Sequence, residues 1–184
     1  MNQTQPPTIN KQVQRNKEYI TSIYSMSFLT RTIVLPYTAI SNNRLMETIE
    51  KYLIFNYEGK CVEEGFIKPG SIQIISHSGG TIENGNNVSF CVVFECKVCF
   101  LVEGTLIRCR ATSITTAGIQ AESANDNPNP ITVFVANDHN YMKPYFSEVK
   151  EGDIINTRVI GQTFQLNDKT VSIIAELIRP TQKT

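Results

Sequence analysis

The sequence predicts an α+β fold with one long helix in its first half and only strands in its second half. Apolar residues recur at helical spacing over residues 43–55, which indicates an amphipathic helix. Every second residue from Val88 to Val102 is apolar and the residues between are mixed, which indicates one long strand. Five shorter strand-like stretches follow between residues 104 and 184. This order predicts a strand–helix–strand half followed by a small β-barrel.

The composition is that of a globular protein with balanced charge. The chain has 184 residues, of which 41% are hydrophobic and 18% charged, enough for a sizeable core. Lysine plus arginine equals aspartate plus glutamate at 17 each, which argues against a purely electrostatic, histone-like binder of nucleic acid. The sequence contains neither a long apolar run nor a secretory signal. We therefore expect an intracellular protein with reduced cysteines and no membrane partner.

The first half is expected to begin with a basic tail. Residues 1–22 are predicted to be flexible, because the first 17 are polar, contain Pro6-Pro7 and hold three basic residues but no acid. Residues 28–35 then form a strand that Pro36 ends. The following helix has an apolar stripe made of Leu45, Met46, Ile49, Tyr52 and Leu53.

A loop and the long strand complete the first half. Residues 77–87 (HSGGTIENGNN) are rich in glycine and asparagine and are expected to project into solvent or towards a partner. The strand over 88–103 is long enough to tie two sub-domains together. Its apolar face consists of Val88, Phe90, Val92, Phe94, Cys96, Val98, Phe100 and Val102.

The second half is expected to contain five strands, at 105–114, 117–122, 131–137, 154–160 and 170–178. Gly118 permits the turn between the first two strands. Tyr145 and Phe146 are expected to pin the longer connection between the third and fourth strands. This pattern suits a small closed barrel of the OB type.

The cysteines are spaced as in some metal proteins. Cys91, Cys96 and Cys99 follow the C-x4-C-x2-C spacing of plant-type iron–sulfur proteins, with Cys109 further on. They lie in an unbroken strand pattern, however, with Cys96 on the opposite face from the other two. We therefore interpret them as buried strand residues and expect no metal and no cofactor. Signatures of common enzyme classes are absent, so no catalytic residue is assigned.

A surface for single-stranded nucleic acid is the more informative hypothesis. OB barrels combine aromatic side chains, which stack on bases, with cations that bind phosphates. The candidates for RNA contact are Arg108, Arg110, Phe134, His139, Tyr141, Lys143 and Arg158. Burial tendencies favour Phe134 as a core residue over a stacking platform. The two neighbouring arginines are equally compatible with a solvated strand face.

The order of segments resembles the stalk subunit of multisubunit RNA polymerases, the family of the seventh subunit of eukaryotic polymerase II and its archaeal counterpart. In the first half the resemblance rests on Pro36-Tyr37, residues 57–61 (YEGKC), the Gly-rich loop and the long strand. In the second half it rests on Gly104, residues 112–122, Phe134, Glu151-Gly152-Asp153, Gly161 and Asn167-Asp168. The chain departs from the family in its short docking loop, which lacks a proline, and in its longer barrel loop, ESANDNPNP.

The resemblance implies a non-catalytic subunit with an RNP-like domain over 23–103 and an OB domain over 104–184. The first domain is expected to dock on the polymerase core subunits, and the second to contact nascent single-stranded RNA. Docking is assigned to Pro36, Tyr37, Ser78, Gly79, Gly80, Ile82 and Gly85. The presence of a smaller stalk subunit as partner stays open.

The composition also indicates a source for the protein, and the sequence leaves one alternative function open. The Asn- and Ile-rich composition and the extra tail suggest a viral version of the family, so the expected site is a nucleus, or a cytoplasmic viral factory or virion. The alternative function is a free-standing OB module that binds single-stranded RNA in translation or RNA decay.

Overall fold

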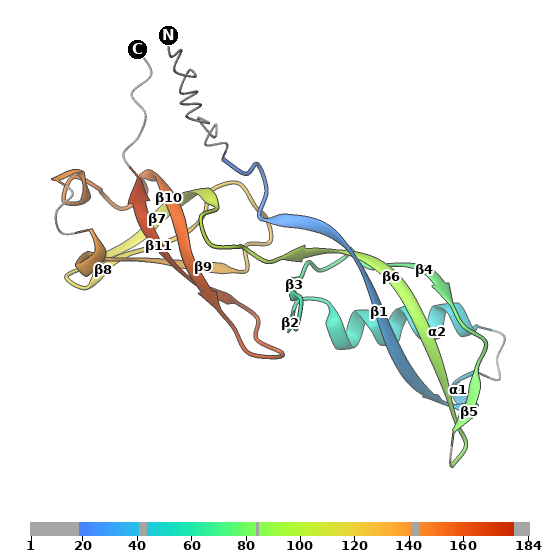
Figure 1. Cartoon of the computed structure of the whole chain (residues 1–184). Coiled ribbons are helices and arrows are strands. Elements are labelled where there is room, and N and C mark those ends of the chain that lie inside the picture. Colours follow the sequence, from blue (N-terminus) through green and yellow to red (C-terminus); the bar gives the residue numbers. More distant parts are fainter. Residues whose placement is uncertain (1–18, 41–43, 84, 141–143, 179–184) are drawn as a thin grey trace, which may run out of the picture.

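The computed structural model describes residues 19–40, 44–83, 85–140 and 144–178. They form an elongated molecule with an antiparallel sheet and its helices at one end and a closed barrel at the other (Figure 1). The predicted α+β class is confirmed, and strands predominate. Neither α-helix in the described residues could span a lipid bilayer.

Strand β6 (Asn87–Cys99) is the centre of the antiparallel sheet. Along one edge it pairs with β1 (Tyr24–Pro36) over the full length of both strands. The other edge of β6 pairs with three short strands, β3 (Gly65–Ile67), β4 (Gln73–His77) and β5 (Thr81–Glu83). The remaining strand, β2 (Cys61–Val62), pairs with β3. Every strand of this sheet except β2 therefore hydrogen-bonds to β6.

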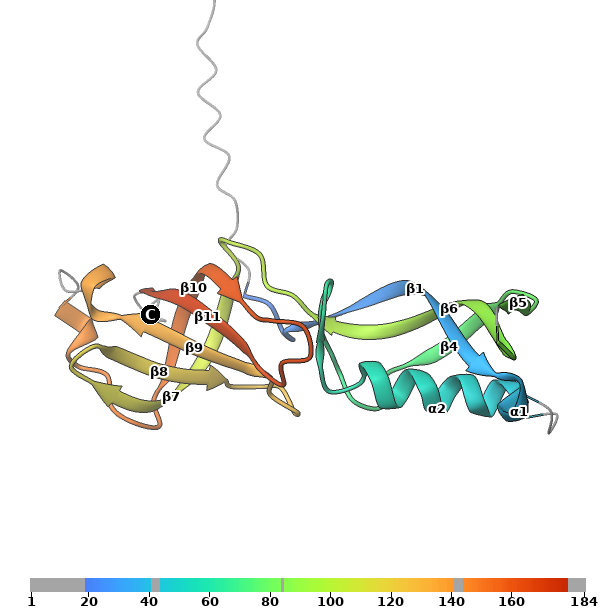
Figure 2. The ribbon, with the colours of Figure 1, turned by 90° about the horizontal axis from the view of Figure 1, so that it is seen from below.

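Helix α2 (Leu45–Tyr57) covers one face of the sheet, and the short α1 (Tyr37–Ile40) joins it to β1 (Figure 2). The expected helix is thus confirmed, shifted by two residues towards the C-terminus. Its residues Ile49 and Leu53 are fully buried against the sheet. Met46, which was expected in the same stripe, is exposed although it lies on the same side of the helix as Ile49 and Leu53; it is in the first turn of α2.

The barrel consists of β7 (Leu106–Thr115), β8 (Gly118–Ser123), β9 (Ile131–Ala136), β10 (Ile154–Thr163) and β11 (Val171–Ile178). The strands close in the order β7-β8-β9-β11-β10, with β9 and β11 parallel and the other pairs antiparallel. All five predicted barrel strands are confirmed. The connection from β9 to β10 contains two 3₁₀ turns, η1 (Asn137–His139) and η2 (Pro144–Phe146), and Tyr145 and Phe146 pack on the barrel core as expected.

Gly118 begins β8, and it has a second role besides the predicted one in the turn. A Cβ atom at this position would lie 2.4 Å from the carbonyl oxygen of Val135 in β9. The glycine is therefore required by the close approach of two barrel strands as well as by the turn before it.

The prediction of one long strand shared by both halves is wrong. Strand β6 ends at Cys99 and pairs only within the antiparallel sheet, and residues 100–105 connect it to β7. Val98 and Cys99 are both buried, but Val98 lies in the core under α2 and Cys99 lies in the barrel core. The next buried residue is Leu101, whereas Phe100 and Val102 are exposed. The apolar face changes sides at Cys99 because a second core begins there.

The two halves are joined by packing and by backbone hydrogen bonds. The N–H of Cys61 in β2 donates to the carbonyl of Asp168 at 2.8 Å, and the N–H of Asn167 donates to the carbonyl of Cys61 at 2.9 Å. These bonds hold the turn between β10 and β11 against β2, at the edge of the antiparallel sheet. Cys61, Phe66, Cys99 and Leu101 from the first half belong to the barrel core.

The chain ahead of β1 is anchored on the barrel, within the range that was expected to be a flexible tail. Asp126 accepts hydrogen bonds from the Ser22 hydroxyl at 2.7 Å and from the Ile23 N–H at 3.2 Å. The Tyr24 hydroxyl donates to the carbonyl of Pro128 at 2.8 Å. The irregular ESANDNPNP loop thus holds the start of β1.

Replacing Phe94 by alanine should destabilise the protein by about 3–5 kcal/mol, because this ring is fully buried where β6 meets α2. Phe28→Ala is the matched control, since Phe28 lies on the neighbouring strand and is 67% exposed. The free energies of unfolding from urea titrations measure both changes. Equal effects of the two substitutions would contradict this assignment of the core.

Candidate functional site

The residues assigned to docking gather at the end of the sheet farthest from the barrel (Figure 1). Pro36 ends β1 and pairs with Asn87, and the N–H of Tyr37 donates to the carbonyl of Asn86 at 2.8 Å. Ile82 in β5 pairs with Val88, the residue that follows Asn87 in β6. The Tyr37 and Ile82 side chains are 63% and 85% exposed. We call this end of the sheet the tip.

The remaining docking candidates lie on and beside the tip. Gly85 lies in the turn into β6, with a positive φ of 79°. Ser78 and Gly79 lie a few residues back along the edge of β6, where the N–H of Ser78 donates to the carbonyl of Cys91. Gly80 packs closely on Val88. The predicted loop over 77–87 is therefore interrupted by a short strand, β5, which extends the sheet to the tip.

The barrel presents Arg108, Arg110 and Phe134 on its outer surface. Arg108 and Arg110 alternate with buried residues of β7 and are exposed. Phe134 also points outwards, so the expectation that it belongs to the core is wrong. The reason is strand alternation, since its neighbours Val133 and Val135 fill the barrel interior. Strand β8 lies between β7 and β9, so Phe134 and the arginines are two strands apart, about 10 Å.

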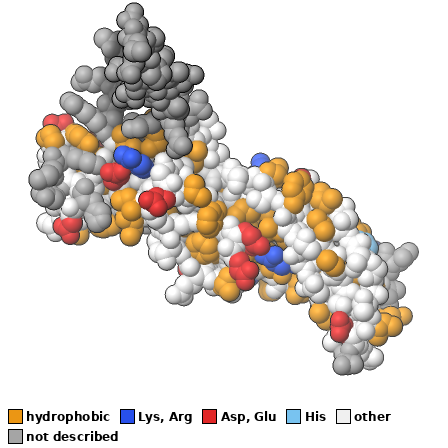
Figure 3. Space-filling view, viewed as in Figure 1, with side chains coloured by type: hydrophobic (Ala, Val, Ile, Leu, Met, Phe, Trp, Pro, Cys, Tyr) orange, Lys and Arg blue, Asp and Glu red, His pale blue; other side chains and the backbone are white. Residues whose placement is uncertain are grey.

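Each of the three barrel arginines lies beside an acidic or an aromatic side chain. Arg158 on β10 forms an ion pair with Glu176 at 2.8 Å, and Arg110 lies directly opposite Glu122 in the β7–β8 register. The guanidinium of Arg108 lies 5.4 Å from the centre of the Tyr19 ring. Figure 3 shows few basic side chains on one face of the molecule, and the two largest basic patches lie beside acidic ones.

The other RNA candidates belong to the β9–β10 connection. His139 is the last residue of η1, and its side chain is not described. Tyr141 and Lys143 lie outside the described residues. Of the RNA-contact candidates that the structure describes, only Arg108 and Arg110 are direct neighbours on the outer face of the barrel.

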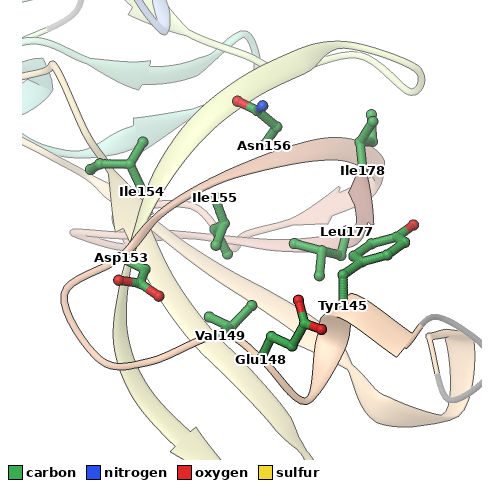
Figure 4. Close-up of a pocket in the computed structure, with 9 residues that line it drawn as sticks. All are labelled: Tyr145, Glu148, Val149, Asp153, Ile154, Ile155, Asn156, Leu177 and Ile178. Atoms are coloured by element: carbon green, nitrogen blue, oxygen red, sulfur yellow. The ribbon is translucent and has the colours of Figure 1, made fainter. Parts of the chain in front are cut away.

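A cavity of about 260 Å³ opens beside η2, and no pattern in the sequence predicted it. Figure 4 shows Tyr145, Glu148 and Val149 on one side of it and Ile155 and Leu177 on the other. The rest of its lining consists of Asp153, Ile154, Asn156 and Ile178. This lining contains two carboxylates, Glu148 and Asp153, and no cysteine, serine or histidine. Its walls come from two separate segments, 145–156 and 177–178, so no local sequence pattern could predict it.

The cysteines do not converge on one point. Cys91 is exposed, whereas Cys96 lies under α2 and Cys99 lies in the barrel core. Within the described ranges, His, Cys, Asp and Glu side chains form no group of three suited to a metal ion. Burial raises the pKa of the Cys96 and Cys109 thiols to about 11 and that of Cys99 to about 12.

Comparison with known proteins adds no relative to this description. No family model matches the chain, and no curated protein sequence matches it significantly.

The thiols should differ sharply in reactivity. At about pH 8 a thiol reagent should modify Cys91 rapidly and the four buried cysteines only after unfolding, because burial keeps those four protonated. The raised pKa values should also lower the free energy of unfolding as pH rises above about 8.5, where the unfolded chain loses thiol protons that the folded chain retains. Counting modified thiols with and without urea tests the first expectation. Rapid modification of more than one thiol in the folded protein would contradict it.

Proposed function

We propose that the chain is a non-catalytic stalk subunit of a DNA-directed RNA polymerase. In this proposal the tip docks on the core subunits of the enzyme, and the barrel stands away from the core beside nascent RNA. The observation that carries it is the gathering of Tyr37, Ile82 and Gly85 at one exposed end of a long molecule, opposite the barrel. A projecting end with exposed apolar side chains suits an anchor, because interfaces concentrate binding energy in a few such residues.

The barrel supports the same proposal. A five-stranded closed barrel with a parallel pair between its third and fifth strands is consistent with the OB type, which binds single-stranded nucleic acid on its second and third strands. In the proposal, residues 23–103 act as an RNP-like docking domain and residues 104–184 as an OB domain. The resemblance that suggests this function also leaves room for a smaller stalk partner. If the protein is viral, the compartment is a cytoplasmic factory or a virion; otherwise it is a nucleus.

The alternative is a free-standing module that binds single-stranded RNA. It is favoured by the outward position of Phe134, whose neighbour across the parallel pair, Ile174, is also exposed. An exposed aromatic on the third barrel strand suits base stacking whether or not a polymerase is present. Co-purification separates the two functions, because only a stalk subunit is retained with large polymerase chains.

Tyr37→Ala combined with Ile82→Asp should leave the protein folded and release it from polymerase, because both side chains are exposed and neither supports a core. The matched control is Phe55→Ala combined with Ile54→Asp, which removes an exposed aromatic and an exposed isoleucine from α2. Affinity capture of the tagged protein, with identification of the retained chains, measures the effect. Retention of polymerase chains at the wild-type level by the tip variant would refute the docking site.

Charge reversal at Arg108 and Arg110 should weaken crosslinking of nascent RNA to this subunit while leaving its incorporation into polymerase intact. Each neutralised phosphate contributes about −0.7 to the slope of log affinity against log salt, so the two arginines account for about −1.4. Phe134→Ala should weaken binding with little change in that slope, because stacking releases few counterions. If neither change alters crosslinking or affinity, the barrel does not contact RNA.

A further inference from the structure

The cavity beside η2 has an apolar floor that belongs to the barrel core. Ile155 of β10 and Leu177 of β11 are 6% and 3% exposed, and both are core residues. Tyr145 and Val149, from the connection between β9 and β10, pack on the same core. The volume of about 260 Å³ is below the roughly 300–1,000 Å³ of pockets for drug-sized ligands. The cavity therefore has the size for one inserted side chain.

The charged side chains of the cavity are both acidic. Glu148 and Asp153 contribute carboxylates, and no lysine or arginine is among the described residues that line the cavity. Figure 4 shows the Glu148 carboxylate directed towards Leu177, beside the Tyr145 ring, with Asp153 at the other end of the cavity. A cation with an apolar stem complements this lining, because the stem can lie on the apolar floor while the charged end meets a carboxylate.

The arginines of β7 lie near the cavity but outside its lining. Arg110 is opposite Ile154 in the β7–β10 register, at the rim of the cavity, and its neighbour on the other side is Glu122. The Arg108 guanidinium lies beside the Tyr19 ring. Both arginines therefore have another acidic or aromatic neighbour, and the lining itself keeps its negative charge.

The turn that carries Asp153 is ordered before any ligand arrives. The N–H of Lys150 donates to the Asp153 carboxylate at 2.9 Å, and the N–H of Asp153 donates to the Lys150 carbonyl at 3.1 Å. Backbone hydrogen bonds from Ala111 of β7 to Gly152 and Asp153, at 2.8 and 2.9 Å, attach this turn to the barrel. A fixed turn lowers the entropic cost of binding.

Among cationic side chains, arginine matches this lining best. Its guanidinium is planar, donates up to five hydrogen bonds and stacks on aromatic rings, so it can meet the Glu148 carboxylate and the Tyr145 ring together. Its methylene stem can cover Val149 and Leu177. Arginine is also enriched in protein–protein interfaces, where a few inserted side chains carry most of the binding energy.

We propose that the cavity beside η2 binds an arginine side chain that a partner protein presents, with Glu148 and Asp153 as the acidic contacts. The site lies on the barrel, at the opposite end of the molecule from the tip. It goes beyond the proposed function, because it gives the barrel a protein partner and depends on neither polymerase nor RNA.

The test uses the full-length protein and acetyl-arginine amide as the probe, with acetyl-citrulline amide as its uncharged analogue. Titration with the arginine probe should shift the backbone amide NMR signals of residues 145–156 and 177–178, and the citrulline probe should not shift them. The shifts should weaken as salt rises, because salt screens the carboxylates.

Glu148→Gln combined with Asp153→Asn should weaken binding of the arginine probe by about tenfold or more, because charge-assisted hydrogen bonds are lost. The amide oxygen left by Asp153→Asn can still accept the bond from the Lys150 N–H, so the turn should keep its structure. The matched control is Glu47→Gln combined with Glu50→Gln, which removes two exposed carboxylates from α2 and should bind as wild type.

Wild-type affinity in the cavity variant, equal binding of the two probes, or shifts confined to other residues would overturn the proposal. Arg179→Gln combined with Lys183→Gln should leave the affinity unchanged; tighter probe binding would instead assign the cavity to the C-terminal residues of this chain. Self-association that the cavity variant abolishes would make a second copy of the chain the occupant and would also overturn the proposal. Co-purification with polymerase is independent of all these outcomes and tests the proposed function separately.

Discussion

The structure depends on the position of β6 between two cores. This strand pairs with β1 along one edge and with three short strands along the other, so the antiparallel sheet has no other centre. Its apolar side chains from Val88 to Val98 pack under α2. At Cys99 the strand ends and its opposite face enters the barrel core. A single strand end therefore fixes where one half of the molecule stops and the other begins.

The barrel closes through its own hydrogen bonds, but residues from outside it help to fill its core. Ile23, Cys61, Phe66, Cys99 and Leu101 all pack among the barrel side chains. Small barrels bury little apolar surface, so losing five contributing residues removes a substantial fraction of the hydrophobic stabilisation. The backbone bonds between Cys61 and the β10–β11 turn act at the same junction. In the proposed stalk function, this junction would keep the tip and the barrel at a fixed separation.

Local periodicity predicted most of the fold, and tertiary context decided the rest. The barrel strands were predictable because alternation of interior and exterior residues is a short-range signal, and the same alternation around Val133 and Val135 would have turned Phe134 outwards. The end of β6 was not predictable, because Phe100 and Val102 continue the apolar period and only the second core reveals the change of face.

Some features of the candidate sites were likewise predictable from the local sequence, and others depended on the tertiary structure. Tyr37 and Ile82 were selected as exposed residues of two loops, and the β1–β6 pairing brings those loops to one end. The pairing of Arg158 with Glu176 depends on strand register, which sequence patterns do not provide. The cavity beside η2 joins residues from separate segments, so no single motif could indicate it.

The first half of the chain completes the barrel core, and expression of residues 104–184 alone tests this dependence most directly. Without Cys61, Phe66, Cys99 and Leu101 the isolated barrel should expose part of its core and be insoluble, or unfold at a much lower temperature than the full chain. Thermal unfolding of both proteins, followed by circular dichroism, gives the comparison. A soluble fragment that unfolds at the temperature of the full chain would contradict this claim.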